Sequence, residues 1–137
     1  MTTTWTLGTD RPIYAQLIEQ IELRIVSGIY RAGDKLPSVR DMAGEAAVNP
    51  NTMQKALAEL ERSGLVYSQR TTGRFITDDK ELIQKMKDKL ASEQIAAFLE
   101  KMRELGFTRE ETLSLMEKVA AESEEKGDVL YGADSGM

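Results

Sequence analysis

Residues 48–64, with the sequence VNPNTMQKALAELERSG, decide the fold because they encode a helix together with both of its ends. Asn49 is a favoured N-cap, and Pro50 then stands at the first helical position, where its missing N–H has no intrahelical partner. Gly64 ends the pattern. Apolar side chains recur at spacings of three and four, which predicts one buried face and one polar face; the buried face consists of Met53, Ala56, Leu57 and Leu60.

Two more helices are predicted before this one. Residues 1–10 are interpreted as an arm held to the body by Trp5 and Leu7, and Pro12 can open a first helix that stops near Gly28. The apolar stripe of that helix is Tyr14, Leu17, Ile18, Ile21 and Ile25. After a turn-rich connector at 31–37, Ser38 can cap a short helix whose buried face is made of mostly small residues that let another helix approach closely, namely Val39, Met42, Ala43, Ala46 and Ala47.

A β-hairpin is predicted after the third helix. Two β-prone runs, 65–70 and 74–77, flank a polar turn at Thr71-Thr72-Gly73. The order of three helices followed by a hairpin is that of a winged helix-turn-helix. We therefore expect a winged helix-turn-helix domain over residues 1–77, in a chain that is mostly α with one small hairpin.

The character of the sequence changes after residue 77. A long helix is predicted across about 79–104, and Asp78-Asp79 suit its N-terminal end because the helix dipole favours negative charge there. Gly106 breaks this helix, and the capping box at 108–111 opens a last helix. Residues 78–126 are thus expected to form a two-helix region, followed by a disordered tail at 127–137.

The apolar stripe of these last helices needs a surface to pack against, because about 50 residues bury little core alone. A second copy of the chain is the expected partner, since a two-fold dimer reads a palindrome with two equivalent helices. The alternative is that the stripe folds back on the winged helix of its own chain. The predicted dimer interface is Leu82, Met86, Leu90, Ile95, Phe98, Leu99, Met102, Leu113 and Met116.

The helix that begins after Asn49 has the features of a DNA-reading helix. In a helix-turn-helix, the second helix lies in the major groove and presents polar side chains from its first turns. Asn51 and Gln54 can pair with adenine edges, Thr52 can bond or touch a thymine methyl, and Lys55 can reach a phosphate or a guanine. The alternative is that these residues only form a solvated helix surface.

Two other segments are candidates for contact with the DNA backbone. Ser38 and Arg40 lie in the first turn of the preceding helix, where free N–H groups and a guanidinium attract phosphate. The alternative for Arg40 is an ion pair with Asp41 or Glu45. The hairpin tip can touch the backbone or the minor groove, or be an exposed turn without a partner; its residues are Thr71, Thr72, Gly73 and Arg74.

Composition narrows the class of protein. The 137 residues contain no cysteine and no histidine, so thiol chemistry is excluded and the commonest general base and metal ligand are missing. We expect no enzyme activity, no cofactor and no metal site. Neither a signal peptide nor a transmembrane stretch is apparent, so no membrane association and a cytoplasmic location are expected.

The net charge of −5 is unevenly distributed. Residues 1–77 hold nine Lys/Arg against eight Asp/Glu, whereas residues 78–137 hold nine against fifteen. A phosphate-binding surface in the first part must therefore come from the placement of charge and not from its excess.

Separated motifs in this chain resemble the GntR family of bacterial regulators. They are RPIY (11–14), AGDKLPSVR (32–40), VNPNT (48–52), ELERSGLV (59–66) and GRFI (73–76). The short helical remainder is similar to the YtrA subfamily, whose C-terminal part is a pair of dimerising helices. The resemblance implies a repressor or regulator of its own operon, which in this subfamily often encodes ABC-type transporters. By position, it implies DNA contacts at Arg40, Asn49, Asn51, Thr52, Gln54 and Gly73.

The chain also departs from the family pattern. Many members have Arg where this chain has Pro50 and Gln54, and a Gly-x-Gly wing turn where it has Thr71-Thr72-Gly73. These differences bear on which bases are read. The alternative function is a winged helix that docks a protein partner and binds no operator. An enzyme built on Asp78-Asp79 or Glu110-Glu111 is disfavoured, because helix starts explain both pairs. The sequence does not identify the operator, the regulated genes or an effector.

Overall fold

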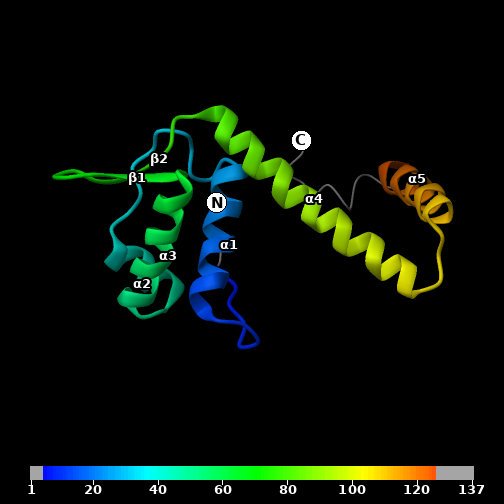
Figure 1. Cartoon of the computed structure of the whole chain (residues 1–137), viewed down its shortest axis with the longest axis horizontal. Helices are drawn as coiled ribbons and strands as arrows, with labels where there is room; N and C mark the ends of the chain where they lie inside the picture. The colour runs from blue at the N-terminus through cyan, green and yellow to red at the C-terminus, as the bar shows by residue number, and fades with distance from the viewer. Residues whose placement is uncertain (1–4, 126–137) are drawn as a thin grey trace. The chain divides into compact units, whose positions relative to one another are not determined.

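The computed structural model describes residues 5–125, which form five helices and one antiparallel hairpin (Figure 1). The predicted fold class is confirmed. The first four residues and the tail expected to be disordered, 127–137, lie outside the described part. In chain order the elements are α1 (Ile13–Val26), α2 (Val39–Ala46), α3 (Pro50–Ser63), β1 (Val66–Gln69), β2 (Gly73–Ile76), α4 (Lys80–Glu104) and α5 (Arg109–Glu125).

Helix α3 is the centre of the N-terminal core. It packs against α1, α2 and β1, and the hairpin extends away from the three helices (Figure 1). Met53, Ala56, Leu57 and Leu60 of α3 are buried, as the spacing predicts. The other buried apolar residues come from every remaining part of the winged helix and include Leu17, Ile21, Ile25, Leu36, Met42, Leu65, Val66 and Ile76.

The ends of α2 and α3 are set by the residues that the sequence singled out. Ser38 Oγ accepts a hydrogen bond from the Asp41 N–H at 3.1 Å, and Asn49 Oδ1 accepts one from the Asn51 N–H at 2.7 Å. Ala47 closes α2 in the left-handed conformation, with φ 59° and ψ 46°. The turn between the two helices is therefore only three residues long, so it fixes their relative direction closely.

The connector between α1 and α2 forms an isolated β-bridge with β2 that the sequence did not predict. Lys35 forms an isolated bridge with Phe75, the Leu36 N–H donates to the Arg74 carbonyl at 2.9 Å, and the Ile76 N–H donates to the Asp34 carbonyl at 2.8 Å. The wing is therefore paired on both sides of β2. Turn-forming residues dominate this connector, and Phe75 lies 40 residues after Lys35, so no local pattern predicts the bridge.

The N-terminal arm packs on α1 as expected, and both Trp5 and Leu7 contact the core. Gln16 of α1 holds the arm, because its Oε1 accepts from the Gly8 N–H at 2.7 Å and its Nε2 donates to the Gly8 carbonyl. The Arg24 guanidinium lies 3.8 Å from the centre of the Trp5 ring. Arg24 is thus a buried cation with an aromatic neighbour.

The chain divides into two compact units inside α4, between Leu90 and Ala91. Leu82, Ile83 and Met86 are half-buried against the core of the first unit. Two of these residues, Leu82 and Met86, were predicted at a subunit interface. Within one chain these two side chains already pack partly against the core of the first unit, and their contact with a second copy stays a prediction.

The starts of the last two helices follow the predicted capping chemistry. Asp79 Oδ1 accepts from the Leu82 N–H at 3.1 Å. The Thr108 N–H donates to Glu111 Oε1 at 3.0 Å while the Glu111 N–H donates to Thr108 Oγ1 at 3.1 Å, which is a reciprocal capping box. None of the described helices combines the length and apolar character that a bilayer span requires.

Candidate nucleic-acid interface

The first two turns of α3 present a polar surface to solvent. Asn51, Gln54 and Lys55 are exposed, and Thr52 is half-buried. Asn49 is exposed, and its side-chain oxygen caps the helix, so its amide nitrogen is the side-chain group that remains to donate a hydrogen bond to a ligand. The side of α3 that the sequence predicts to read DNA is therefore accessible.

The start of α2 lies beside this helix and is also exposed. The Ser38 hydroxyl accepts a hydrogen bond from its own helix, so it acts as a cap. Arg40 is exposed, and in the described part of the chain it forms no ion pair with Asp41 or Glu45. Glu45 instead accepts a long hydrogen bond of 3.5 Å from Trp5 Nε1. The guanidinium of Arg40 is consequently available to an external anion.

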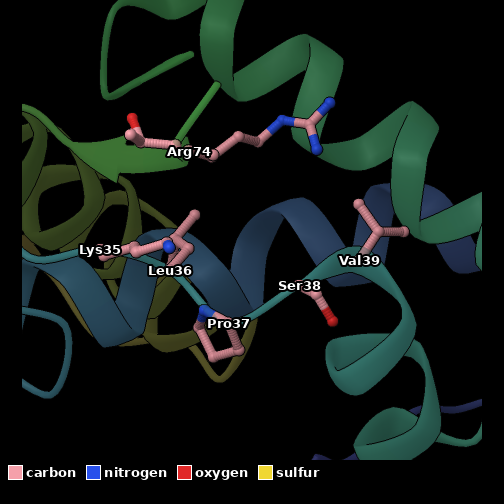
Figure 2. A pocket seen from close by; sticks show the side chains of 8 residues that line it. Lys35, Leu36, Pro37, Ser38, Val39 and Arg74 are labelled. Carbon is pink, nitrogen blue, oxygen red and sulfur yellow. The ribbon is translucent and has the colours of Figure 1, made fainter. Parts of the chain in front are cut away.

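A cleft of about 690 Å³ separates the wing from the segment that leads into α2. Figure 2 shows Lys35, Leu36, Pro37, Ser38 and Val39 along one wall and Arg74 on the other. Thr72 and Gly73 complete the lining. The cleft brings the cap of α2 and the wing turn together, although 34 residues separate Ser38 from Thr72 in the sequence.

The wing turn is a tight structure. The Thr72 hydroxyl donates to Gln69 Oε1 at 2.9 Å, and its N–H donates to the Gln69 carbonyl at 3.2 Å. Gly73 has φ 112°, a conformation that favours glycine, and an added Cβ would lie 3.2 Å from Lys35 Cε. Thr71 and Thr72 are exposed at this turn, as predicted.

Arg74 does not share that exposure. Its Nε donates to Glu61 Oε2 of α3 at 2.5 Å, and its side chain is only 19% exposed. Figure 2 shows the guanidinium extending toward a helix of the chain. The sequence placed Arg74 at an exposed tip with DNA as its partner, whereas in the structure it is paired with a carboxylate of its own chain. Glu61 was not a candidate because its partner lies 13 residues away, beyond helical spacing.

Lys55 is also engaged within the chain. Its ammonium group lies 3.9 Å from the centre of the Tyr14 ring, a cation–π contact between α3 and α1. The sequence assigned Tyr14 only to the apolar stripe of α1. Because Lys55 remains exposed, it keeps access to solvent from this position.

Ion pairs neutralise three of the arginines of the winged helix. Arg11 pairs with Glu19, Arg62 with Glu59 and Arg74 with Glu61. Among the described residues of the winged helix, the exposed cations that form no ion pair are Arg31, Lys35, Arg40, Lys55 and Arg70. Lys35 lines the cleft, and Arg70 is in the wing turn. Neither was among the predicted site residues. The position of Lys35 within the AGDKLPSVR motif and that of Arg70 near the wing glycine are the signals that could have identified them.

One carboxylate of each pair considered for an enzyme caps a helix. Asp79 caps α4 and Glu111 belongs to the capping box of α5. The described residues hold no cluster of three or more side chains suited to a metal ion.

Comparison with known proteins places this arrangement in context. The model of the gntR family of bacterial regulatory proteins matches residues 13–76. The HTH-type transcriptional regulator YhcF of Bacillus subtilis is 46% identical over 105 residues, which are 77% of this chain and 87% of YhcF. The HTH-type transcriptional repressor YtrA of the same organism is 44% identical over 71 residues, or 52% of this chain and 55% of YtrA.

A solved structure shows a similar fold over most of the chain. The GntR family transcriptional regulator from Listeria monocytogenes aligns with a TM-score of 0.77 and 38% identity, and the alignment covers 82% of this chain and 98% of that one. These relatives are transcription regulators and not enzymes, in agreement with the sequence-based expectation.

Proposed function

This chain belongs to the GntR family of bacterial regulatory proteins, and we propose that it is a homodimeric repressor of a palindromic operator near its own operon. The family places it among DNA-binding transcription regulators, and the match to YtrA agrees with the predicted subfamily. We further propose that it acts in the cytoplasm, where bacterial DNA lies.

One observation carries the proposed DNA contact. The exposed polar face of α3 lies in the same unit as several exposed cations that form no ion pair, of which Lys35, Arg40 and Arg70 flank the α2 cap and the wing turn. Phosphate contacts from such cations fix the register of a protein on the duplex, while amide and hydroxyl groups read base edges in the major groove. We assign the first role to the three cations and the second to Asn51 and Gln54.

The proposed dimer is supported by the second unit. An apolar groove between the later turns of α4 and α5 is lined almost entirely by hydrophobic side chains, namely Phe98, Met102, Thr112, Leu115, Met116, Val119 and Ala120. Several predicted interface residues remain exposed here, including Ile95 at 54% and Phe98 at 39%. A second copy of the same two helices would remove this surface from water and present two α3 helices to a palindrome.

DNA binding is tested by fluorescence anisotropy with the promoter upstream of the protein's own gene at several salt concentrations. Arg40→Ala is expected to weaken binding to all sequences and to reduce the slope of log K against log[salt] by about 0.9. Asn51→Ala is expected to cost about 1–3 kcal/mol for the preferred operator only. Arg109→Ala, an exposed cation of the second unit, is the matched control and should change neither quantity.

Two results would contradict the proposed DNA contact. If the wild-type chain does not bind its promoter at low salt, the alternative of a winged helix that docks a protein partner is favoured. If Arg40→Ala behaves like Arg109→Ala, the assignment of the interface to α2 and α3 is wrong.

The dimer is tested separately by analytical ultracentrifugation. Phe98→Glu places a charge in the apolar groove and is expected to produce monomers, because an unpaired buried charge strongly opposes association. Lys101→Glu places the same charge on an exposed position of the same helix and should leave the dimer intact. A wild-type chain that sediments as a monomer at all concentrations would refute the dimer.

A further inference from the structure

Glu61 joins the last turn of α3 to both strands of the wing. Its Oε2 accepts hydrogen bonds from Ser68 Oγ at 2.8 Å and from Arg74 Nε at 2.5 Å. Ser68 and Arg74 are direct partners in the register of β1 and β2. A single carboxylate oxygen therefore holds a cross-strand pair against the helix.

This ion pair is less accessible to water than the pairs Arg11–Glu19, Arg62–Glu59 and Arg103–Glu100. The side chains of Arg74 and Glu61 are 19% and 30% exposed, whereas those of Arg11 and Glu19 are 48% and 52% exposed. Partial burial raises the pKa of Glu61, but the hydrogen bonds from Arg74 and Ser68 outweigh it and leave the pKa below its ordinary value of 4.5. Glu61 is thus ionised at neutral pH, and salt screens the pair less than it screens an exposed one.

Arg74 is also fixed through its backbone. Its carbonyl accepts the Leu36 N–H at 2.9 Å, in the segment that leads to the cap of α2. The residue thereby links three segments: the connector that leads into α2, α3 through Glu61, and the wing of which it is part. A change at this junction would alter the angle between the wing and α3.

We infer that Arg74 is a positioning residue for DNA binding and not a phosphate ligand, and that Glu61 and Arg74 together hold the wing in register with α3. This inference rests on the proposed function, because it presupposes that α3 and the wing touch the same duplex. It reassigns a residue that the sequence alone places among the DNA contacts.

The two roles predict opposite effects of removing Glu61. A phosphate ligand competes with Glu61 for the Arg74 guanidinium, so Glu61→Gln would free that guanidinium and strengthen DNA binding. A positioning pair needs both partners, so Glu61→Gln and Arg74→Met each weaken binding. In that case the double variant binds no more weakly than the weaker single variant, because both substitutions remove the same interaction.

Salt dependence gives the second distinction. Each phosphate contact contributes about 0.9 to the slope of log K against log[salt] on duplex DNA. Arg74→Met is expected to keep the wild-type slope while binding falls by about threefold to tenfold, within the usual range of coupling between contacting residues. Arg40→Ala is the matched arginine variant and is expected to reduce the slope.

The experiment uses the full chain and the duplex that the wild-type protein selects most strongly from a randomised pool. Affinities are measured between about 50 and 200 mM salt, where phosphate contacts dominate the change. Circular dichroism confirms that each variant is folded. If Glu61→Gln does not fold, Ser68→Ala removes one of the two hydrogen bonds to Glu61 without changing a charge, and it should weaken binding at an unchanged slope.

The possible outcomes distinguish failure of the positioning role from failure of the proposed function on which it rests. A loss of about 0.9 in slope for Arg74→Met, or tighter binding by Glu61→Gln, overturns the positioning role alone. Failure of the wild-type chain to select any duplex, or an unchanged slope in Arg40→Ala, overturns the proposed interface. Weaker binding by both single variants at the wild-type slope supports the inference.

Discussion

Ala47→Gly is expected to stabilise the protein without changing what it binds. Ala47 is the only residue other than glycine with a positive φ in the described part of the chain, and it closes α2 just before α3 begins. A β-carbon in the left-handed conformation costs roughly 1–2 kcal/mol. The side chain is exposed, so removing its methyl group gives up little buried surface.

The net effect follows from two opposing contributions. Relief of the left-handed strain favours the folded glycine variant, while the greater freedom of glycine in the unfolded chain opposes it by about 0.4–1 kcal/mol. The difference is a stabilisation of about 0.5–1 kcal/mol, or a rise of a few degrees in Tm for a domain of this size. DNA affinity should not change, because the backbone of the turn already has the conformation that glycine adopts.

Gly64→Ala is the matched substitution in the opposite direction. Gly64 closes α3 with φ 89°, and an added Cβ would lie 3.5 Å from Leu82 Cδ2, an ordinary contact. No side chain has to move, so the cost is that of the backbone conformation, and a destabilisation of about 1 kcal/mol is expected.

Urea denaturation followed by circular dichroism measures both effects at one fixed protein concentration, because association would otherwise change the apparent stability. The midpoint should rise for Ala47→Gly and fall for Gly64→Ala, each with an unchanged m-value. If Ala47→Gly lowers the midpoint, the left-handed turn is not a source of strain and the reasoning is wrong.

Three other predictions concern ionised, aromatic and capping groups. Because the folded pKa of Glu61 lies below 4.5, its contribution to the free energy of unfolding is present above that pH and is lost as the pH falls through the folded value; urea midpoints from about pH 6 to pH 3 should fall less steeply in Glu61→Gln than in the wild-type chain, and parallel curves would contradict this. A double-mutant cycle with Tyr14→Leu and Lys55→Met should give a coupling of about 0.5–1 kcal/mol, as for an exposed cation–π contact, and a value of zero would show that the contact contributes nothing. Thr108→Ala should remove one bond of the capping box and lower stability by about 1 kcal/mol in calorimetry, whereas Thr108→Ser should retain it; equal losses in the two variants would point away from capping.

Features that depend on neighbouring residues could be predicted from the sequence. Ser38 and Asn49 cap the helices that they precede, and Gly64 closes α3, because each acts on backbone groups within a few positions. The exposed face of α3 follows from helical spacing in the same way. For the site, this was enough to place Asn51 and Gln54 on an accessible surface.

Side-chain partners across the fold could not be predicted in this way. The sequence predicts that Arg74 and Lys55 are cations free to contact DNA. In the structure, Arg74 forms an ion pair with Glu61, and Lys55 contacts the ring of Tyr14. Leu82 and Met86 continue the same stripe as Phe98, yet the first two pack on the winged helix of their own chain.

The sequence by itself determined the order and limits of the helices, the presence of the hairpin, and the family to which the chain belongs. Helical spacing, caps and family motifs each depend on residues that lie close together in the sequence. Only the tertiary structure decided which charges stay free for a ligand, as at Arg40, and which are neutralised inside the chain, as at Arg74. The physical reason is that a charge interacts with whatever lies within a few ångströms in space, and that neighbourhood is set by packing between segments distant in the sequence.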